Sequence, residues 1–241
     1  MPIYGHRARI GYTSPPLFAE VFPYEFYKIV PPGVTLMLTT LAIATRSKEE
    51  VDQSYQTSLS AAHTMAKAGA TLVMLGGNPI NLSRGLGNLD DITSRMEREI
   101  GVPVLTSSQS QIKALQLLGS RKIATVHPYE PEHNARHEAA IREFGFEPAG
   151  VIAVGGSVAD LGSVPDETAL KLARRIKQEN PDADTIHFAS AHWATAGSID
   201  AVERELGVSV MTSHQAITWA CLRRAGITDK IAGYGRLLRE F

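Results

Sequence analysis

Cysteine is scarce in this sequence, because the 241 residues contain only Cys221. One cysteine excludes an internal disulfide framework and any metal site that needs several cysteines. Long hydrophobic runs are also missing: stretches such as 71–75 and 34–38 are far shorter than the roughly 20 residues of a membrane-spanning helix. The first residues, 1–4, lack the hydrophobic stretch of a signal peptide. We therefore expect a soluble, cytoplasmic protein that does not contact a membrane.

An excess of charge of one sign is absent as well. Lys and Arg together number 24 and Asp and Glu together number 25, which gives a net charge of −1. Binding to the nucleic-acid backbone requires a basic face, so we expect no nucleic-acid partner. The sequence has no P-loop and no G-x-G-x-x-G motif, and Gly233-Tyr234-Gly235-Arg236 lies too near the C-terminus to begin a nucleotide-binding unit. We therefore expect no cofactor.

Short hydrophobic runs alternate with amphipathic stretches along the chain. Ser47 and Glu50 form a capping box before one such stretch, and further helices are predicted from Asp90, Pro165 and Ile199. Strands that alternate with helices indicate βα units, and hence an α/β fold with parallel sheets. The predicted strands are Arg9–Tyr12, Val34–Thr39, Thr71–Leu75, Pro103–Thr106, Lys122–Val126, Gly150–Val154, Thr185–Ala189 and Ser209–Thr212.

The sequence also repeats itself at an offset of 106 residues, since 98–109 reads REIGVPVLTSSQ and 204–215 reads RELGVSVMTSHQ. A chance likeness between common helix–glycine–strand units is the alternative, but the length of the repeat favours a duplication. We therefore predict two pseudo-symmetric three-layer domains, each with a four-stranded parallel sheet, and an active site between them. The predicted domains are 1–106 plus 214–241 and 107–213.

Small and polar residues follow several predicted strands. Gly77 and Asn78 come after the strand at 71–75, where they could bring backbone N–H groups and an amide close to a ligand, or form a plain turn. Ser107 and Ser213 each begin a helix after a strand, where they could bind a carboxylate or simply cap the helix. The residues alone leave both alternatives open.

Three histidines, His127, His192 and His214, also follow predicted strand ends, with Tyr129 and Ser190 beside them. Ligands of open parallel sheets bind at the carboxyl ends of the strands, and histidine is the usual acid or base near neutral pH. Each histidine alone could instead be a surface or capping residue. Three histidines could bind zinc, but their spacing matches no metal motif, so we predict no metal site.

In their order along the chain, these residues resemble the pattern of the aspartate/glutamate racemase superfamily. They are most similar to the branch that contains arylmalonate decarboxylase and maleate cis-trans isomerase, and the resemblance covers nearly the whole chain. It rests on Pro15-Pro16, Gly76-Gly77-Asn78-Pro79, Ser83-Arg84-Gly85, Pro128-Tyr129, Asn134, Ser213-His214-Gln215-Ala216, Trp219 and Gly233-Tyr234-Gly235-Arg236-Leu237-Leu238. The fold of that superfamily has two pseudo-symmetric α/β domains, which agrees with the internal repeat.

The resemblance implies acid and base chemistry at a carbon next to a carboxylate. Racemases use two cysteines, the decarboxylases keep the second one to protonate an enediolate, and maleate isomerases use a cysteine as nucleophile. These two positions correspond to Gly77 and Ser190 here, and Cys221 is expected in the core of the last long helix. The resemblance still implies a carboxylate or enediolate site on Pro15, Asn78, Tyr129, Ser190 and backbone donors near Gly77 and Ala191.

We therefore predict a cofactor-free, decarboxylase-like lyase that acts on a small malonate-type or unsaturated dicarboxylic acid through an enediolate. A hydrolase or hydratase, an isomerase or racemase-like protein, and a non-catalytic carboxylate binder are the alternatives. Since imidazole is a better acid near neutral pH than a hydroxyl, His192 is the predicted proton donor.

The predicted catalytic residues are His192, Ser190 and Tyr129. The predicted substrate-binding residues are Pro15, Gly77, Asn78, Ser107, His127, Asn134 and His214. The expected partner is a small carboxylic acid, and the sequence leaves open whether the protein forms a homo-oligomer.

Overall fold

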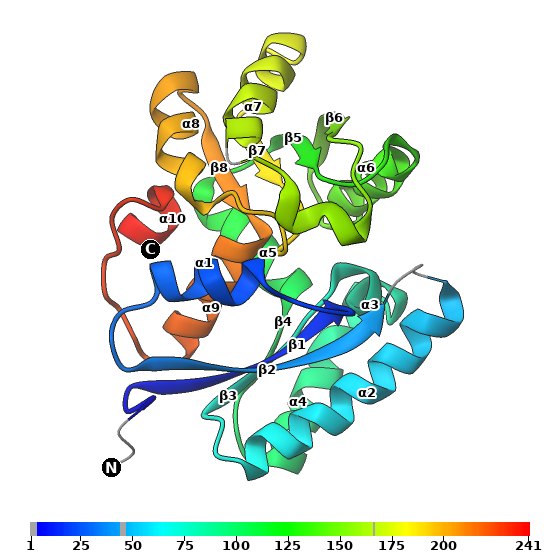
Figure 1. Cartoon of the computed structure of the whole chain (residues 1–241), viewed down its shortest axis with the longest axis vertical. Helices are drawn as coiled ribbons and strands as arrows, with labels where there is room; N and C mark the ends of the chain where they lie inside the picture. The colour runs from blue at the N-terminus through cyan, green and yellow to red at the C-terminus, as the bar shows by residue number, and fades with distance from the viewer. Residues whose placement is uncertain (1–3, 44–46, 166) are drawn as a thin grey trace. The chain divides into compact units, whose positions relative to one another are not determined.

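The computed structural model describes residues 4–43, 47–165 and 167–241. The chain forms two compact units, each assembled from several stretches (Figure 1). The first unit comprises the chain up to Ala19, Val30–Ser110 and Ile217–Asp229, and the second comprises Glu20–Ile29, Gln111–Ala216 and Lys230–Phe241. This division differs from the predicted domains, 1–106 plus 214–241 and 107–213, in the segments 20–29, 107–110, 214–216 and 230–241. Contacts alone do not define folding domains, so the predicted boundaries stay a prediction.

The first unit contains a four-stranded parallel sheet with the order β2-β1-β3-β4. Met65, Met96 and Val73 meet in a hydrophobic cluster, because two amphipathic helices pack against the same face of this sheet. Its strands are β1 (Ala8–Pro16), β2 (Val34–Ile43), β3 (Leu72–Leu75) and β4 (Val104–Thr106). Its helices include α2 (Lys48–Lys67), α3 (Asn78–Ser83), α4 (Leu89–Ile100) and the short 3-10 helix η1 (Leu86–Asn88). As predicted, α2 begins at Ser47, whose hydroxyl accepts the backbone N–H of Glu50.

The second unit contains a second four-stranded parallel sheet with the order β6-β5-β7-β8. The two sheets confirm the predicted α/β fold. The strands are β5 (Lys122–His127), β6 (Glu147–Ala153), β7 (Thr185–Phe188) and β8 (Ser209–Thr212). The helices include α1 (Val21–Ile29), α6 (Asn134–Glu143), α7 (Glu167–Glu179), α8 (Ile199–Leu206) and α10 (Gly235–Glu240), with the 3-10 helices η2 (Pro131–His133), η3 (Val158–Ser163) and η4 (Ala196–Ser198).

The internal repeat corresponds to two equivalent turns from a strand into a helix. Thr106 Oγ1 accepts the Gln109 N–H at 3.2 Å, and Thr212 Oγ1 accepts the Gln215 N–H at 2.9 Å. Gln215 completes a capping box, because its side-chain oxygen accepts the backbone N–H of Thr212, whereas Gln109 Oε1 accepts the hydroxyl of Thr106. The threonines therefore cap the helices α5 (Ser107–Leu118) and α9 (Ser213–Arg224).

This capping differs from the one that the sequence predicts. Ser107 and Ser213 are the first residues inside their helices, so they are not the caps. The Ser107 hydroxyl instead donates to Asn81 Oδ1 at 2.8 Å, and the Ser213 hydroxyl donates to Gln111 Oε1 at 3.2 Å. Because the threonines cap the helices, both serines are left for contacts with other helices, with Asn81 in α3 and with Gln111 in α5.

Strand β1 is longer than the sequence predicts, since it continues through Pro15-Pro16. Prolines usually end a strand, because they lack the N–H that a central ladder requires. Here Ser14 pairs with Thr40 and Pro16 pairs with Ile43, and an irregularity between these two pairs accommodates the prolines. The extension carries Pro15 beyond the end of β3, towards the loops that follow the neighbouring strands.

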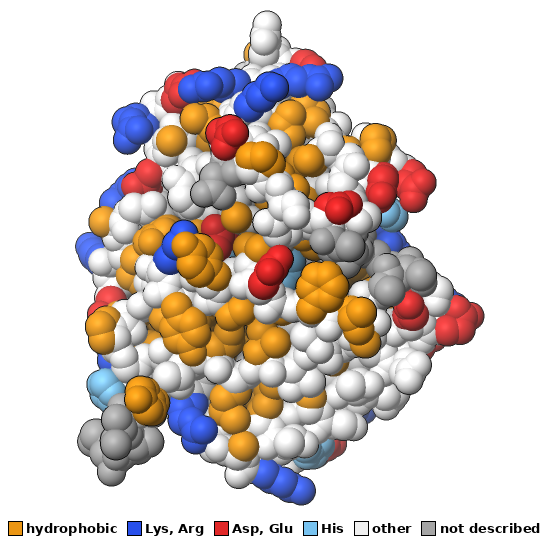
Figure 2. Space-filling view, viewed as in Figure 1, with side chains coloured by type: hydrophobic (Ala, Val, Ile, Leu, Met, Phe, Trp, Pro, Cys, Tyr) orange, Lys and Arg blue, Asp and Glu red, His pale blue; other side chains and the backbone are white. Residues whose placement is uncertain are grey.

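The surface mixes charges of both signs. Figure 2 shows Lys and Arg side chains interspersed with Asp and Glu, with hydrophobic side chains among them. Within the described residues, no helix combines the length and the hydrophobicity that crossing a membrane requires.

Candidate active site

Two predicted site residues meet at the carboxyl end of the second sheet. Strands β5 and β7 are neighbours, and Val126 pairs with Phe188 near their ends. The loops that follow these strands therefore emerge side by side, and they bring Tyr129 to Ser190. The Tyr129 hydroxyl donates a hydrogen bond to Ser190 Oγ at 3.1 Å.

Ser190 adopts an unusual backbone conformation. Its φ is +91°, in a region that residues other than glycine rarely occupy. Such conformations cost about 1–3 kcal/mol and are concentrated at functional sites. The backbone N–H of His192 donates to the same Oγ at 3.2 Å. A serine hydroxyl accepts two hydrogen bonds and donates one, so the donors on Tyr129 and His192 direct the Ser190 hydrogen away from themselves.

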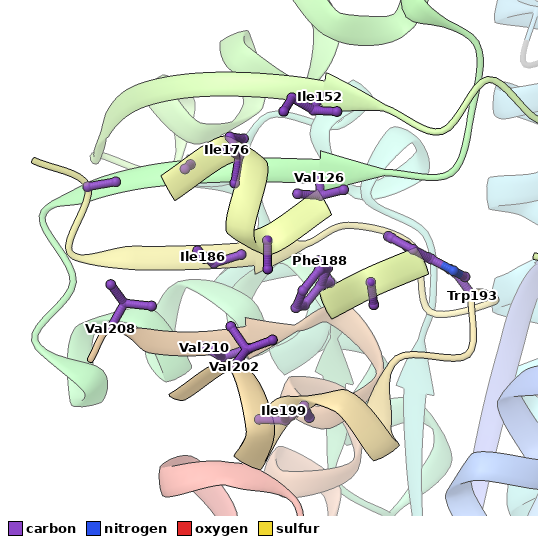
Figure 3. Close-up of a cluster of buried hydrophobic side chains, with 14 residues drawn as sticks. Val126, Ile152, Ile176, Ile186, Phe188, Trp193, Ile199, Val202, Val208 and Val210 are labelled. Carbon is purple, nitrogen blue, oxygen red and sulfur yellow. The ribbon is translucent and has the colours of Figure 1, made fainter. Parts of the chain in front are cut away.

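The loop that carries Ser190 is anchored in the core of the second unit by Trp193. This side chain is fully buried and meets the ring of Phe188 edge-on, with 5.7 Å between the ring centroids. Figure 3 shows Trp193 at one end of the cluster, beside Phe188. Further along the loop, the buried carboxylate of Glu25 on α1 accepts the Ala196 N–H at 2.9 Å. These two buried anchors thus support the strained serine.

The side chain of His192 is buried, and this changes its predicted role. Burial, and to a lesser degree His214 nearby, lowers the pKa of His192 from 6.5 to about 3. Its imidazole is therefore neutral at pH 7. This lowered pKa disfavours the predicted role of His192 as an imidazolium that supplies a proton.

The predicted binding residue His214 is also buried and neutral. Burial lowers its pKa to about 4, partly opposed by a hydrogen bond with the Phe22 carbonyl. His214 Nε2 lies 3.0 Å from this carbonyl oxygen, and the two rings lie 4.5 Å apart. Phe22 also lies 6.0 Å from the ring of His192. Both histidines thus pack against α1, which the sequence did not indicate as a helix.

A cluster of aromatic rings surrounds Tyr129. The predicted pair His127 and Asn134 is brought together, with 2.8 Å between His127 Nε2 and Asn134 Oδ1. His137 stacks on His127 with 4.1 Å between centroids, and it lies parallel to Tyr129 at 6.0 Å. His133 meets Tyr129 edge-on. The cluster limits the positions that the tyrosine ring can adopt.

The first unit presents a second set of predicted residues at the carboxyl ends of β1 and β3. Gly77 has a φ of +93°, and a Cβ on it would lie 2.6 Å from Pro15 Cγ. The predicted pair Pro15 and Gly77 is therefore in close contact, and only glycine fits. The Gly76 N–H donates to Thr13 Oγ1 at 3.0 Å, which fixes the start of this loop.

Asn78 and Ser107 are also brought together in the first unit. Ser107 Oγ lies 3.4 Å from Asn78 Oδ1, and Ser108 Oγ donates to the same oxygen at 3.0 Å. Asn81 accepts from both the Ser107 hydroxyl and the Ser108 backbone N–H. Ser108 and Asn81 are not among the predicted site residues. The repeat at 98–109 contains Ser108, but its buried contacts depend on the tertiary fold.

The single thiol and the acidic side chains near Tyr129 complete the description of the predicted residues. Cys221 lies in α9 and is buried as expected, and burial raises the pKa of its thiol. Among the described residues, the ligand atoms of Glu130, Glu132 and His133 form one group that lies within 4.8 Å. That group contains none of the three histidines that follow predicted strand ends. The expectation that the two sets of site residues line a single cleft stays a prediction.

A model of the arylmalonate decarboxylase family matches residues 10–238, which is nearly the whole chain. The chain belongs to this family. Among curated proteins, the arylmalonate decarboxylase of Bordetella bronchiseptica is 30% identical over 233 residues, which are 96% of each chain. The maleate isomerase of Nocardia farcinica (strain IFM 10152) is 26% identical over 140 residues, or 57% of this chain and 55% of that protein.

Solved structures agree with this membership of the arylmalonate decarboxylase family. A liganded arylmalonate decarboxylase, in which one glycine is replaced by cysteine and one cysteine by serine, is 29% identical, with a TM-score of 0.86 over 97% of this chain and 100% of that one. The maleate isomerase Iso from Pseudomonas putida S16 was solved with maleate as a variant in which one cysteine is replaced by alanine. It is 21% identical and has a TM-score of 0.84 over 96% of this chain and 97% of that one. At that identity the second likeness concerns the fold.

Proposed function

We propose that this protein is a cofactor-free decarboxylase that removes CO₂ from a small malonate-type dicarboxylic acid through an enediolate. Membership of the arylmalonate decarboxylase family supports the reaction type. The hydrogen bond from Tyr129 to Ser190 Oγ is the single observation that carries the proposal for this chain. It puts two polar hydroxyl groups in contact at the carboxyl end of a parallel sheet, where substrates of such folds bind.

The reaction needs one bond to break and one to form. The bond between the central carbon and one carboxylate breaks, CO₂ leaves, and the electron pair passes into the other carboxylate as an enediolate. A proton must then reach the central carbon, which gives a monocarboxylate. Hydrogen-bond donors aimed at the developing charge are commonly the largest catalytic contribution, worth roughly 10²–10³ in rate for each donor.

Ser190 is the proton donor in this proposal. Its hydroxyl accepts from Tyr129 and from the His192 N–H, so its own hydrogen is directed elsewhere. These two donors would also stabilise the alkoxide that remains after the proton has left. The carbon of an enediolate is a stronger base than an alkoxide, so a hydroxyl can protonate it. Water then returns the proton to Ser190.

The substrate carboxylates are proposed to bind to donors that follow the strands. Asn78 offers a carboxamide, and Gly77 offers a backbone N–H. Ala191, next to Ser190, offers a further N–H. Because each group follows the end of a strand, we propose them as the binding groups for the carboxylate that is retained and for the enediolate.

The hydrolase alternative loses its first candidate base. With a pKa of about 3, His192 is too weak a base to activate water efficiently at neutral pH. The isomerase alternative requires a nucleophilic thiol, and the thiol of Cys221 is buried with a raised pKa. Neither alternative is favoured by a specific contact among the described residues.

The test is a panel of acids followed by NMR with the purified protein. Phenylmalonate and methylmalonate report decarboxylation, maleate reports isomerisation to fumarate, and fumarate reports hydration to malate. Formation of a monocarboxylate supports the proposal, and it should be lost in Ser190→Ala but kept in Ser209→Ala, a serine at the amino end of β8. Turnover of maleate or fumarate alone would overturn it. Thermal stabilisation by these acids without turnover would identify a carboxylate binder and overturn it as well.

A further inference from the structure

The carboxamide of Asn78 is held by a serine from another element. Asn78 begins α3, and its Oδ1 accepts a hydrogen bond from the hydroxyl of Ser108 on α5 at 3.0 Å. Ser108 is fully buried and Asn78 is partly buried, so water has limited access to this bond. A buried hydrogen bond of this kind fixes a side chain more strongly than an exposed one, because water does not compete with it.

The neighbouring contacts decide which way each group points. The Ser108 backbone N–H lies 3.1 Å from Asn81 Oδ1, and a backbone N–H can only donate. That atom of Asn81 is therefore the carbonyl oxygen. The Ser107 hydroxyl, 2.8 Å from the same oxygen, must then donate to it and uses its only hydrogen there. Its contact with Asn78 Oδ1 is longer, at 3.4 Å, so Ser108 makes the shorter hydrogen bond to Asn78.

The contact with Ser108 gives the orientation of Asn78. In the structure its carbonyl oxygen accepts the Ser108 hydroxyl on α5, so its NH₂ group lies on the opposite side of the planar carboxamide. An NH₂ group donates two hydrogen bonds, and a carboxylate accepts them. The start of α5 is itself fixed by the two hydrogen bonds between Thr106 and Gln109. Ser108 thus sits on a rigid element, which is what accurate placement of a binding group requires.

We infer that Ser108 and Asn81 are positioning residues that hold the NH₂ group of Asn78 ready for a substrate carboxylate. This inference rests on the proposed function, and it deepens it by naming the residues that act through Asn78. Neither residue needs to touch the substrate. Their effect is to keep the donor side of Asn78 from rotating away, where its carbonyl oxygen would repel a carboxylate.

The experiment measures malonate affinity by calorimetry in four variants of the full chain. Asn78→Ala and Ser108→Ala should each weaken malonate binding about 10-fold or more, which is the range for one lost hydrogen bond to a charged group. The double variant should bind no more weakly than Asn78→Ala alone, because both changes remove the same donor. Ser110→Ala is the matched control: its buried hydroxyl on the same helix donates only to the Thr106 carbonyl, so malonate affinity should stay within about twofold.

Several outcomes would overturn the inference. Additive losses in the double variant would mean that Ser108 does not act through Asn78. Equal losses of malonate affinity in Ser108→Ala and Ser110→Ala would mean a general effect on α5. The inference would also be overturned if the unchanged protein does not bind malonate and a crystal structure of Ser108→Ala shows Asn78 in the same position. Turnover of phenylmalonate is measured separately. If the protein does not decarboxylate phenylmalonate but binds malonate, and the losses in Asn78→Ala and Ser108→Ala are not additive, the positioning role stands and the proposed function fails.

Discussion

The Tyr129 hydroxyl donates to Ser190 Oγ at 3.1 Å, and this contact joins the loops that follow β5 and β7. Tyr129→Phe removes the donor and keeps the ring packed in its cluster. We expect kcat to fall by about 10²–10³, the range for one lost donor to a developing negative charge. Steady-state kinetics on the best substrate of the panel measures the change.

The matched control for this variant is Tyr27→Phe, on the exposed side of α1. It removes an exposed phenolic oxygen that has no part in the proposed chemistry, so kcat should not change. A Tyr129→Phe variant that keeps the full kcat would show that the hydroxyl of Tyr129 has no catalytic role.

The strained backbone of Ser190 gives a second prediction. At a φ of +91°, glycine fits without steric cost, whereas alanine keeps the strain and loses the hydroxyl. Ser190→Gly should therefore be more stable than Ser190→Ala by about 1 kcal/mol, although both variants lose turnover. Urea unfolding of the two variants measures the difference, and equal midpoints would mean that the backbone is relaxed at this position.

Gly77 gives a third prediction. Its φ is +93°, and a methyl group added at this position would lie 2.6 Å from Pro15 Cγ, so Gly77→Ala should destabilise the protein by about 1–3 kcal/mol. Gly87→Ala is the control, because a Cβ at Gly87 meets nothing within 4 Å. The midpoints of urea unfolding of the two variants measure the difference in stability. If both variants unfold at the same urea concentration, the contact with Pro15 carries no cost.

Because three histidines are buried, we expect the protein to lose stability in mild acid. The pKa values of His187 and His192 are lowered to about 3, and that of His214 to about 4, mainly by burial. In the unfolded chain these groups take up protons below about pH 6.5, whereas the folded protein does not. Their contribution to stability is therefore complete above pH 6.5 and is lost as the pH falls towards 4.

The size of this loss follows from linkage. Between pH 7 and pH 5.5, each histidine should lower the free energy of unfolding by about 1.3 kcal/mol, and the three together by roughly 4 kcal/mol. Urea unfolding at both pH values measures this difference. His214→Gln should reduce it by about one third, while the exposed His63→Gln should leave it unchanged. A wild-type protein equally stable at both pH values would contradict the burial of these side chains.

The sequence was sufficient to predict the eight strands and the parallel α/β units, because hydrophobic periodicity directly reflects burial. It also indicated the repeat, whose two copies share a threonine, Thr106 or Thr212, that accepts a backbone N–H of the following helix. It did not indicate α1, although Phe22 and Glu25 on that helix contact the segments that carry His192 and His214. Contacts of this kind join segments that are far apart in the chain.

The lowered pKa of His192 is the largest departure from what the sequence indicates for the site. An unperturbed histidine titrates near neutral pH, and the sequence carries no sign of how deeply a loop residue is buried. Only the packing of His192 against Phe22 and beside His214 explains its lowered pKa. Likewise, the hydrogen bond from Ser108 to Asn78 connects α5 to α3, so neither partner's contact can be read from the sequence alone.

The central claim is that Ser190 protonates the carbon from which CO₂ has left. The most direct measurement is NMR of phenylmalonate turnover in D₂O by the unchanged protein, by Ser190→Ala and by His192→Ala. The account predicts phenylacetate with one deuterium at the central carbon, a rate about 10²–10⁴ lower in Ser190→Ala, and a smaller loss in His192→Ala, since its neutral imidazole is not the acid. A Ser190→Ala protein that turns over phenylmalonate as fast as the unchanged protein would contradict it.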